Sequence, residues 1–214
     1  SSIRMREEFI SNFSVSKEII EILPNPVDLE LIRSSALYMK RFDNGGICYI
    51  ASGRLTFQKG FDRLLKWFST LDDKKSTLVI LGDGDDKHAL IQQSDELNLQ
   101  NKVKFVGFCD NPWQWYAGAD CFLLSSRWEG LPNVVLESLA CGTRVISTIE
   151  SGGVVEIAKQ TAEGGLVVVS SDSSFIDEML KVERNPVKKI KESLLPSMYH
   201  IESSVLIIER LIEY

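Results

Sequence analysis

The sequence of 214 residues predicts an α/β fold, an open parallel sheet of about six strands flanked by helices. Short apolar runs of strand length alternate with segments of helical character over most of the chain, which is the pattern of βαβ units. The length is enough to bury a core in one domain or at most two. Two of the strand-like runs end in polar loops, and open α/β sheets bind their ligands at such strand ends.

The strand-like and helical segments follow one another in regular order. The run 47–51 has the unbroken apolar pattern of a buried strand, and 120–126 is an apolar run of strand length that ends in serines. The expected strands are 47–52, 77–81, 103–106, 121–124, 144–147 and 166–169. The expected helices are 61–71, 87–97, 112–117, 133–141, 154–159, 174–182 and 186–195. An amphipathic helix is predicted over 1–13, and 199–214 carries apolar residues at helical spacing.

Two glutamates, Glu129 and Glu137, lie eight positions apart across a loop that becomes a helix. Pro132 suits the first helical position and Asn133 can cap the first turn. The free N–H groups at such a helix start form an anion site. This layout suits a ligand with a phosphate in the middle and hydroxyl-bearing rings at both ends, as in a nucleotide sugar. The alternative is that both carboxylates are simply solvated.

A second motif follows the first strand, where Arg54 and Lys59 precede Gly60 and the helix 61–71. A guanidinium fork and an ammonium charge at the carboxyl end of a strand suit a diphosphate. The order Lys-Gly-Phe excludes a Walker A loop, which needs Gly-Lys-Ser/Thr. The alternative is a surface loop with two solvated cations.

Four motifs occur in one order and together carry a family resemblance. They are Pro24-Asn25-Pro-Val-Asp28, Arg54-x4-Lys59-Gly60, Glu129-x7-Glu137 and Ser151-Gly-Gly-Val-Val-Glu156. As a set they resemble the carboxyl-terminal, donor-binding half of retaining GT-B glycosyltransferases of the family 4 type (glycosyl transferases group 1), over nearly the whole chain. The resemblance implies a Rossmann-like domain, one half of a GT-B fold. It also implies transfer of a hexose or N-acetylhexosamine from a nucleoside-diphosphate sugar to a glycan or lipid-linked acceptor.

The resemblance also implies a role for each matching residue. Arg54 and Lys59 match the diphosphate clamp, and Glu129 matches the acidic residue that faces the sugar, so these three are the expected catalytic residues. The expected donor-binding residues are Gly130 and Leu131 at the sugar, Asn133 and Val134 at the phosphate, Glu137 at the ribose and Phe108 at the base. No metal and no further cofactor is expected, because the clamp supplies the positive charge. A UDP-sugar is favoured over a GDP-sugar, and polysaccharide biosynthesis is the expected context.

The resemblance also predicts the roles of the two ends of the chain. Segment 1–20 is expected to be a helix and linker from a preceding acceptor-binding domain that is missing here, 21–198 the nucleotide-sugar-binding domain, and 199–214 a helix that crosses back. The whole enzyme is expected in the cytoplasm, with peripheral association at the inner face of the membrane. The chain alone is expected to bind donor without transferring sugar.

Composition excludes several other partners. A formal net charge of −6 disfavours binding to nucleic acid. No apolar run approaches the ~20 residues of a membrane helix. The four cysteines fit reduced, buried thiols, and the two histidines lie too far apart in sequence to suggest a zinc site.

Other functions remain open from the residues alone. A GT-B relative with different sugar-nucleotide chemistry, such as an epimerase, and a non-catalytic nucleotide-sugar-binding module would share these motifs. A metal-dependent GT-A enzyme would instead use Asp83 and Asp85, which an ordinary glycine turn explains as well. Trp128 could pack at a rim or stack on a ligand beside Glu129.

Overall fold

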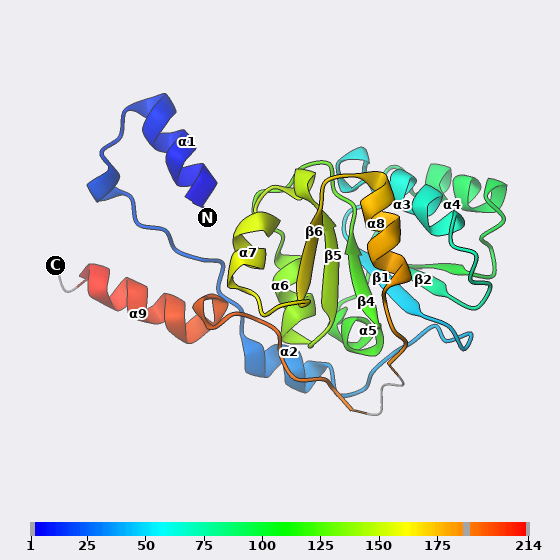
Figure 1. Ribbon diagram of the computed structural model, residues 1–214. Coiled ribbons are helices and arrows are strands. Elements are labelled where there is room, and N and C mark those ends of the chain that lie inside the picture. The colour runs from blue at the N-terminus through cyan, green and yellow to red at the C-terminus, as the bar shows by residue number, and fades with distance from the viewer. Residues whose placement is uncertain (1–2, 186–188, 213–214) are drawn as a thin grey trace.

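The computed structural model describes residues 3–185 and 189–212 and confirms the predicted fold class. Six parallel strands form one sheet in the order β3-β2-β1-β4-β5-β6 (Figure 1). The strands are β1 (Cys48–Ser52), β2 (Thr77–Leu81), β3 (Val103–Gly107), β4 (Cys121–Leu124), β5 (Arg144–Thr148) and β6 (Leu166–Val169). The expected strands differ from these by one residue at most, because unbroken apolar runs of this length suit a sheet that is covered on both faces.

Helices cover both faces of the sheet, and each face has its own apolar cluster. On one face lie α2 (Leu29–Ser35), α5 (Trp113–Gly118), α6 (Asn133–Ala140) and α7 (Val154–Gln160). On the other lie α3 (Phe61–Ser69), α4 (Lys87–Glu96) and α8 (Asp172–Leu180). Strand residues alternate between the two clusters, so Ile50 packs on the first face while Tyr49 and Ala51 pack on the second.

Two helix predictions need correction. The helix α2 was not expected, although Asp28 caps it by accepting a hydrogen bond from the Leu31 amide at 2.8 Å. The expected helix 186–195 is wrong over 189–195, while 186–188 lie outside the described residues. Tertiary hydrogen bonds replace helical ones in this segment. The Leu194 amide donates to the Leu139 carbonyl at 2.8 Å, and the Lys191 carbonyl accepts from Arg33 at 2.9 Å.

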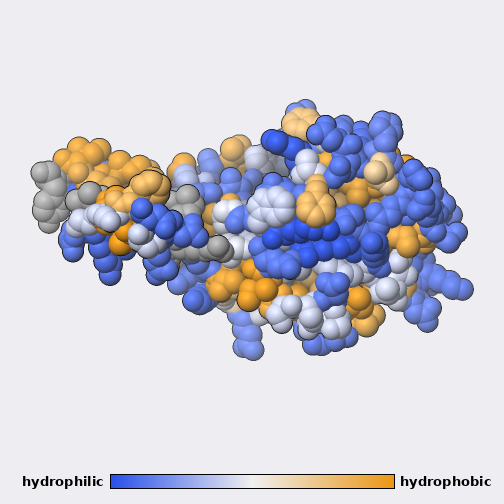
Figure 2. All heavy atoms as spheres, turned by 90° about the horizontal axis from the view of Figure 1, so that it is seen from above, coloured by the Kyte–Doolittle hydropathy of each residue, from blue (hydrophilic) through white to orange (hydrophobic). Residues whose placement is uncertain are grey.

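The two end helices, α1 (Ile3–Phe13) and α9 (Ile201–Ile212), lie to one side of the layered core (Figure 1). The segments beside them run together, because the Val27 amide donates to the Tyr199 carbonyl at 2.8 Å. Apolar side chains gather at the end of the molecule that holds these helices (Figure 2). The exposed ones on α9 are Ile201, Val205, Leu206, Ile208, Leu211 and Ile212. No helix of the described part is long and apolar enough to cross a membrane.

The loops that follow β1 and β4 touch at Gly60. Its φ is +67°, in the left-handed region, and a Cβ at this position would lie 2.1 Å from the Ser125 carbonyl oxygen. Glycine therefore lets α3 begin directly against the end of β4. Gly164 has a similar φ of +77° but no heavy atom within 4 Å of its would-be Cβ.

We predict that Gly60→Ala destabilises the chain more than Gly164→Ala does. Both substitutions cost about 1–2 kcal/mol of left-handed strain, and only the first adds an overlap worth about 1–3 kcal/mol. Equilibrium urea unfolding of the two variants measures the difference. Equal losses of unfolding free energy would show that the loops do not need this close approach.

Candidate functional site

The order of the strands reverses between β1 and β4, which pair directly at the centre of the sheet. The chain leaves β1 for α3 on one face of the sheet and leaves β4 for α6 on the other. The loops after these two strands therefore separate and leave a crevice at the carboxyl edge, the usual ligand site of open α/β sheets. The structure brings both sequence motifs to this crevice.

Lys59 and Glu129 form an ion pair across the crevice. The distance from Lys59 Nζ to Glu129 Oε1 is 2.5 Å, and the two side chains are only 20% and 9% exposed. The Ser126 hydroxyl donates to the same carboxylate oxygen at 2.7 Å. The motifs were predicted to bind two different parts of a ligand, and in this structure their charged groups instead bind each other.

Arg63 on α3 holds the loop after β4 in place. Its guanidinium donates to the Ser125 carbonyl at 2.8 Å, to the Ser126 carbonyl at 2.9 Å and to the Thr148 hydroxyl at 3.3 Å. The Ser126 carbonyl also accepts from the hydroxyls of Thr148 and Ser151, at 3.1 and 2.9 Å. The sequence analysis missed Arg63, since no local pattern marks an arginine whose partners lie more than 60 positions away.

Arg54 is exposed and lines two hollows. Within the described part of the chain its guanidinium has no hydrogen-bond or ion-pair partner, in contrast to Lys59. The site therefore holds one paired cation and one unpaired cation.

The first hollow, of about 440 Å³, brings Arg54 together with Phe108, Val134 and Glu137. Glu137 is half-buried there, and burial raises the pKa of its carboxyl above the ordinary value. The Trp113 indole donates to Glu137 Oε2 at 3.2 Å, which partly offsets that rise in pKa. Phe108 is 77% exposed at the rim. A carboxylate deep in the hollow and an aromatic ring at its edge suit a ribose and its base.

The helix α6 begins at Asn133, with Pro132 before it, so Asn133 does not cap the helix as predicted. Its side chain instead accepts a hydrogen bond at 2.6 Å from Asn25, in the Asn-Pro-Val-Asp motif before α2. The backbone amides of Asn133 and Val134 have no acceptor among the described residues. Val134 lines the same hollow as Arg54, so the start of α6 and the guanidinium both bring positive potential to it.

Gly130 and Leu131 form the loop between Glu129 and α6. The Gly130 carbonyl accepts from the Gly153 amide at 2.9 Å, so the Gly152-Gly153 turn supports this loop.

Asp83 and Asp85 were the candidate metal ligands of the GT-A alternative. Asp83 pairs with Lys87 at 2.8 Å, and the described residues contain no group of three or more metal-ligating side chains that includes Asp83 or Asp85.

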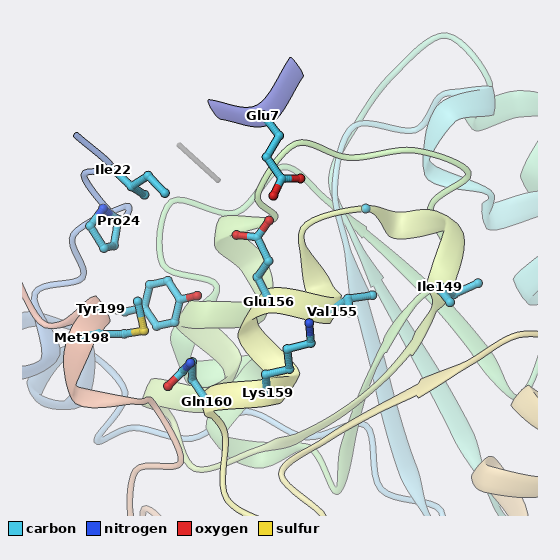
Figure 3. A pocket seen from close by; sticks show the side chains of 11 residues that line it. Glu7, Ile22, Pro24, Ile149, Val155, Glu156, Lys159, Gln160, Met198 and Tyr199 are labelled. Carbon is cyan, nitrogen blue, oxygen red and sulfur yellow. The ribbon is translucent and has the colours of Figure 1, made fainter. Parts of the chain in front are cut away.

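A further hollow of about 460 Å³ lies between α1, the linker before α2, the region of α7 and the segment just before α9 (Figure 3). Glu7, Glu156 and Tyr199 point into it, with Lys159 nearby. The sequence did not indicate this hollow, because its walls come from four segments that are far apart in the chain.

Comparison with known proteins shows the family. The model of the family "Glycosyl transferases group 1" matches residues 40–194. The chain belongs to this family, and the resemblance drawn from the four motifs is confirmed.

Two relatives illustrate the similarity. The N-acetylgalactosamine-N,N'-diacetylbacillosaminyl-diphospho-undecaprenol 4-alpha-N-acetylgalactosaminyltransferase of Campylobacter jejuni is 34% identical over 191 residues, which is 85% of this chain and 52% of that protein. The lipopolysaccharide core biosynthesis glycosyltransferase LpsE of Rhizobium meliloti is 30% identical over 168 residues, 77% of this chain and 43% of that protein. The chain thus spans about half the length of these relatives.

Solved structures support the fold. The lipopolysaccharide outer core galactosyltransferase WaaB matches 98% of this chain and 60% of its own with a TM-score of 0.73 at 21% identity. Anabaena HepE in complex with UDP and glucose matches 100% of this chain and 62% of its own with a TM-score of 0.74 at 19% identity. The GT-A alternative is therefore wrong, and the domain has the Rossmann-like fold of one GT-B half.

We predict that Glu137→Gln makes the chain more stable at neutral pH and weakens its binding of UDP. Because burial raises the pKa of Glu137, the folded chain holds this proton more tightly than the unfolded chain does. The ionised carboxylate therefore lowers the free energy of unfolding, increasingly as pH rises from the ordinary pKa to the raised one and fully above it. At pH 7 the free energy of unfolding of the variant should exceed that of the unaltered chain by more than ~0.5 kcal/mol, the scatter of surface substitutions. This difference should vanish at acid pH.

Urea unfolding between acid and neutral pH measures this change, with exposed Glu163→Gln as the matched control. The amide still accepts from Trp113, so the packing is kept. A loss of stability at pH 7 would contradict the placement of Glu137 as a buried ligand-binding charge.

Proposed function

We propose that this domain binds the donor of a retaining glycosyltransferase, a nucleoside-diphosphate sugar, in the crevice between β1 and β4. One observation carries the proposal: the Lys59–Glu129 pair lies beside Arg54, the free amides of α6 and the half-buried Glu137. Glu129 suits the sugar, the two cations and the helix amides suit the diphosphate, and Glu137 suits the ribose.

Each group has a task in this proposal. Arg54 and Lys59 bind the diphosphate, and the amides of Asn133 and Val134 contribute partial positive charge. Glu137 accepts from the ribose hydroxyls, and Phe108 borders the base. Glu129, with Gly130 and Leu131 beside it, faces the sugar. Because these groups supply the positive potential, the proposal needs no metal ion.

In this proposal the ion pair between Lys59 and Glu129 breaks when the donor binds. The ammonium group turns from the carboxylate to a diphosphate oxygen, and the carboxylate becomes free to accept from sugar hydroxyls. In the reaction the bond between the sugar's anomeric carbon and the diphosphate breaks, and a bond to the acceptor oxygen forms with the same configuration. Lys59 and Arg54 stabilise the charge on the leaving diphosphate, and the acceptor hydroxyl gives its proton to an oxygen of that diphosphate.

The sugar is proposed to be a hexose or N-acetylhexosamine on UDP. The named activity of the Campylobacter jejuni relative and the UDP bound in HepE support this choice. We propose a glycan or lipid-linked acceptor, held with a second domain of the whole protein, in the cytoplasm at the membrane's inner face. The chain alone should bind donor without transfer, because positioning of the acceptor can contribute roughly 7–11 kcal/mol.

We predict that the chain binds UDP equally well with and without EDTA, and that Lys59→Ala weakens this binding about tenfold or more, the scale of one lost charge-assisted hydrogen bond. Isothermal titration calorimetry measures both. Lys66→Ala, which removes an exposed cation from α3, is the matched control and should leave the affinity unchanged. Binding that needs a divalent metal, or that survives Lys59→Ala unaltered, would refute the assignment of the clamp.

A further inference from the structure

Two aromatic side chains, Phe57 and Trp128, lie open to solvent beside the Lys59–Glu129 pair. They are 62% and 53% exposed, and their ring centroids are 6.2 Å apart. One comes from the loop after β1 and the other from the loop after β4. Aromatic side chains that are exposed next to each other form an apolar patch, and such patches often mark binding sites.

The backbone around this pair is fixed by hydrogen bonds between the two loops. The Arg127 amide donates to the Gln58 carbonyl at 2.7 Å, and its guanidinium donates to the Phe57 carbonyl at 2.6 Å. The Gln58 side chain donates to the Trp128 carbonyl at 2.9 Å. Arg127 also binds Asp62 with two hydrogen bonds of 2.8 Å and lies over the Phe57 ring at 3.8 Å. A ligand would therefore meet a preformed surface.

The pair lines the second hollow, of about 620 Å³, together with Arg54, Thr56, Gln58 and Lys59. Its lining combines aromatic faces with hydroxyl, amide and cationic groups. A pyranose ring has the matching chemistry, because its C–H groups carry the partial positive charge that aromatic faces attract and its hydroxyls form hydrogen bonds at the edges. The ammonium group of Lys59 belongs to both this hollow and the crevice.

We propose that Phe57 and Trp128 form a stacking platform for the acceptor glycan, which places its sugar ring beside the bond that is broken in the donor. The inference rests on the proposed function and specifies its acceptor side. Neither Phe57 nor Trp128 lines the hollow to which the proposed function assigns the base and ribose, so a ring on this platform leaves those positions free.

The test is a glycan array carrying hexose, deoxyhexose and N-acetylhexosamine oligosaccharides, probed with the 214-residue chain in the presence of UDP. We expect the chain to bind a subset of the glycans and Phe57→Ala/Trp128→Ala to lose at least tenfold of that signal. Its affinity for UDP should stay unchanged, which also shows that the variant is folded. Tyr38→Ala removes a side chain that is 82% exposed elsewhere and should have no effect.

Several results would overturn the platform: no glycan binding by the unaltered chain, an unchanged array pattern in the double variant, or loss of UDP binding in that variant. Binding to phosphatidylglycerol vesicles that depends on the two rings would also overturn it in favour of a membrane contact. A different result would refute the proposed function instead: the chain does not bind UDP but binds glycans, and that binding needs the two rings. The platform would then stand.

Discussion

The reversal of strand order between β1 and β4 is the constraint on which the site depends. Because α3 and α6 leave these neighbouring strands for opposite faces of the sheet, the carboxyl edge between the two strands is left as a crevice. The two loops meet where Gly60 lies against the Ser125 carbonyl and where Arg63 binds the carbonyls of the second loop. Hydrogen bonds of Arg127 and Gln58 also join the two loops. These contacts fix the spacing at which Lys59 reaches Glu129, so the geometry of the charged groups follows from the topology.

The charges at this edge are in balance without a ligand. Glu129 neutralises Lys59, Arg54 stays in water, and Glu137 occupies a hollow where burial raises its pKa. In the proposed function, a diphosphate that enters this arrangement would gain two cations and a helix start and would release a carboxylate toward the sugar. The Lys59–Glu129 pair thus reduces the repulsion that two unpaired cations on neighbouring residues of this loop would exert on each other.

The sequence predicted the strands closely, because apolar runs and glycine-bounded loops are local signals. It also predicted which residues gather at the carboxyl edge, since motifs after parallel strands must meet there. The predictions failed where contacts between residues far apart in the chain determine the local structure. Segment 189–195 has helical composition, but its hydrogen bonds go to α6 and α2 rather than along the chain. The Arg63 network, the Asn25–Asn133 contact and the direct Lys59–Glu129 pair depend on distances in space that no spacing along the chain encodes.

The central claim is that the nucleotide binds at the β1–β4 crevice, and NMR mapping of the chain with UDP tests it most directly. We expect UDP to shift the backbone amides of Asn133 and Val134, the side-chain signals of Arg54 and Lys59, and the ring signals of Phe108. Shifts confined to the hollow that Glu156, Lys159 and Tyr199 line, with the crevice unaffected, would contradict the account.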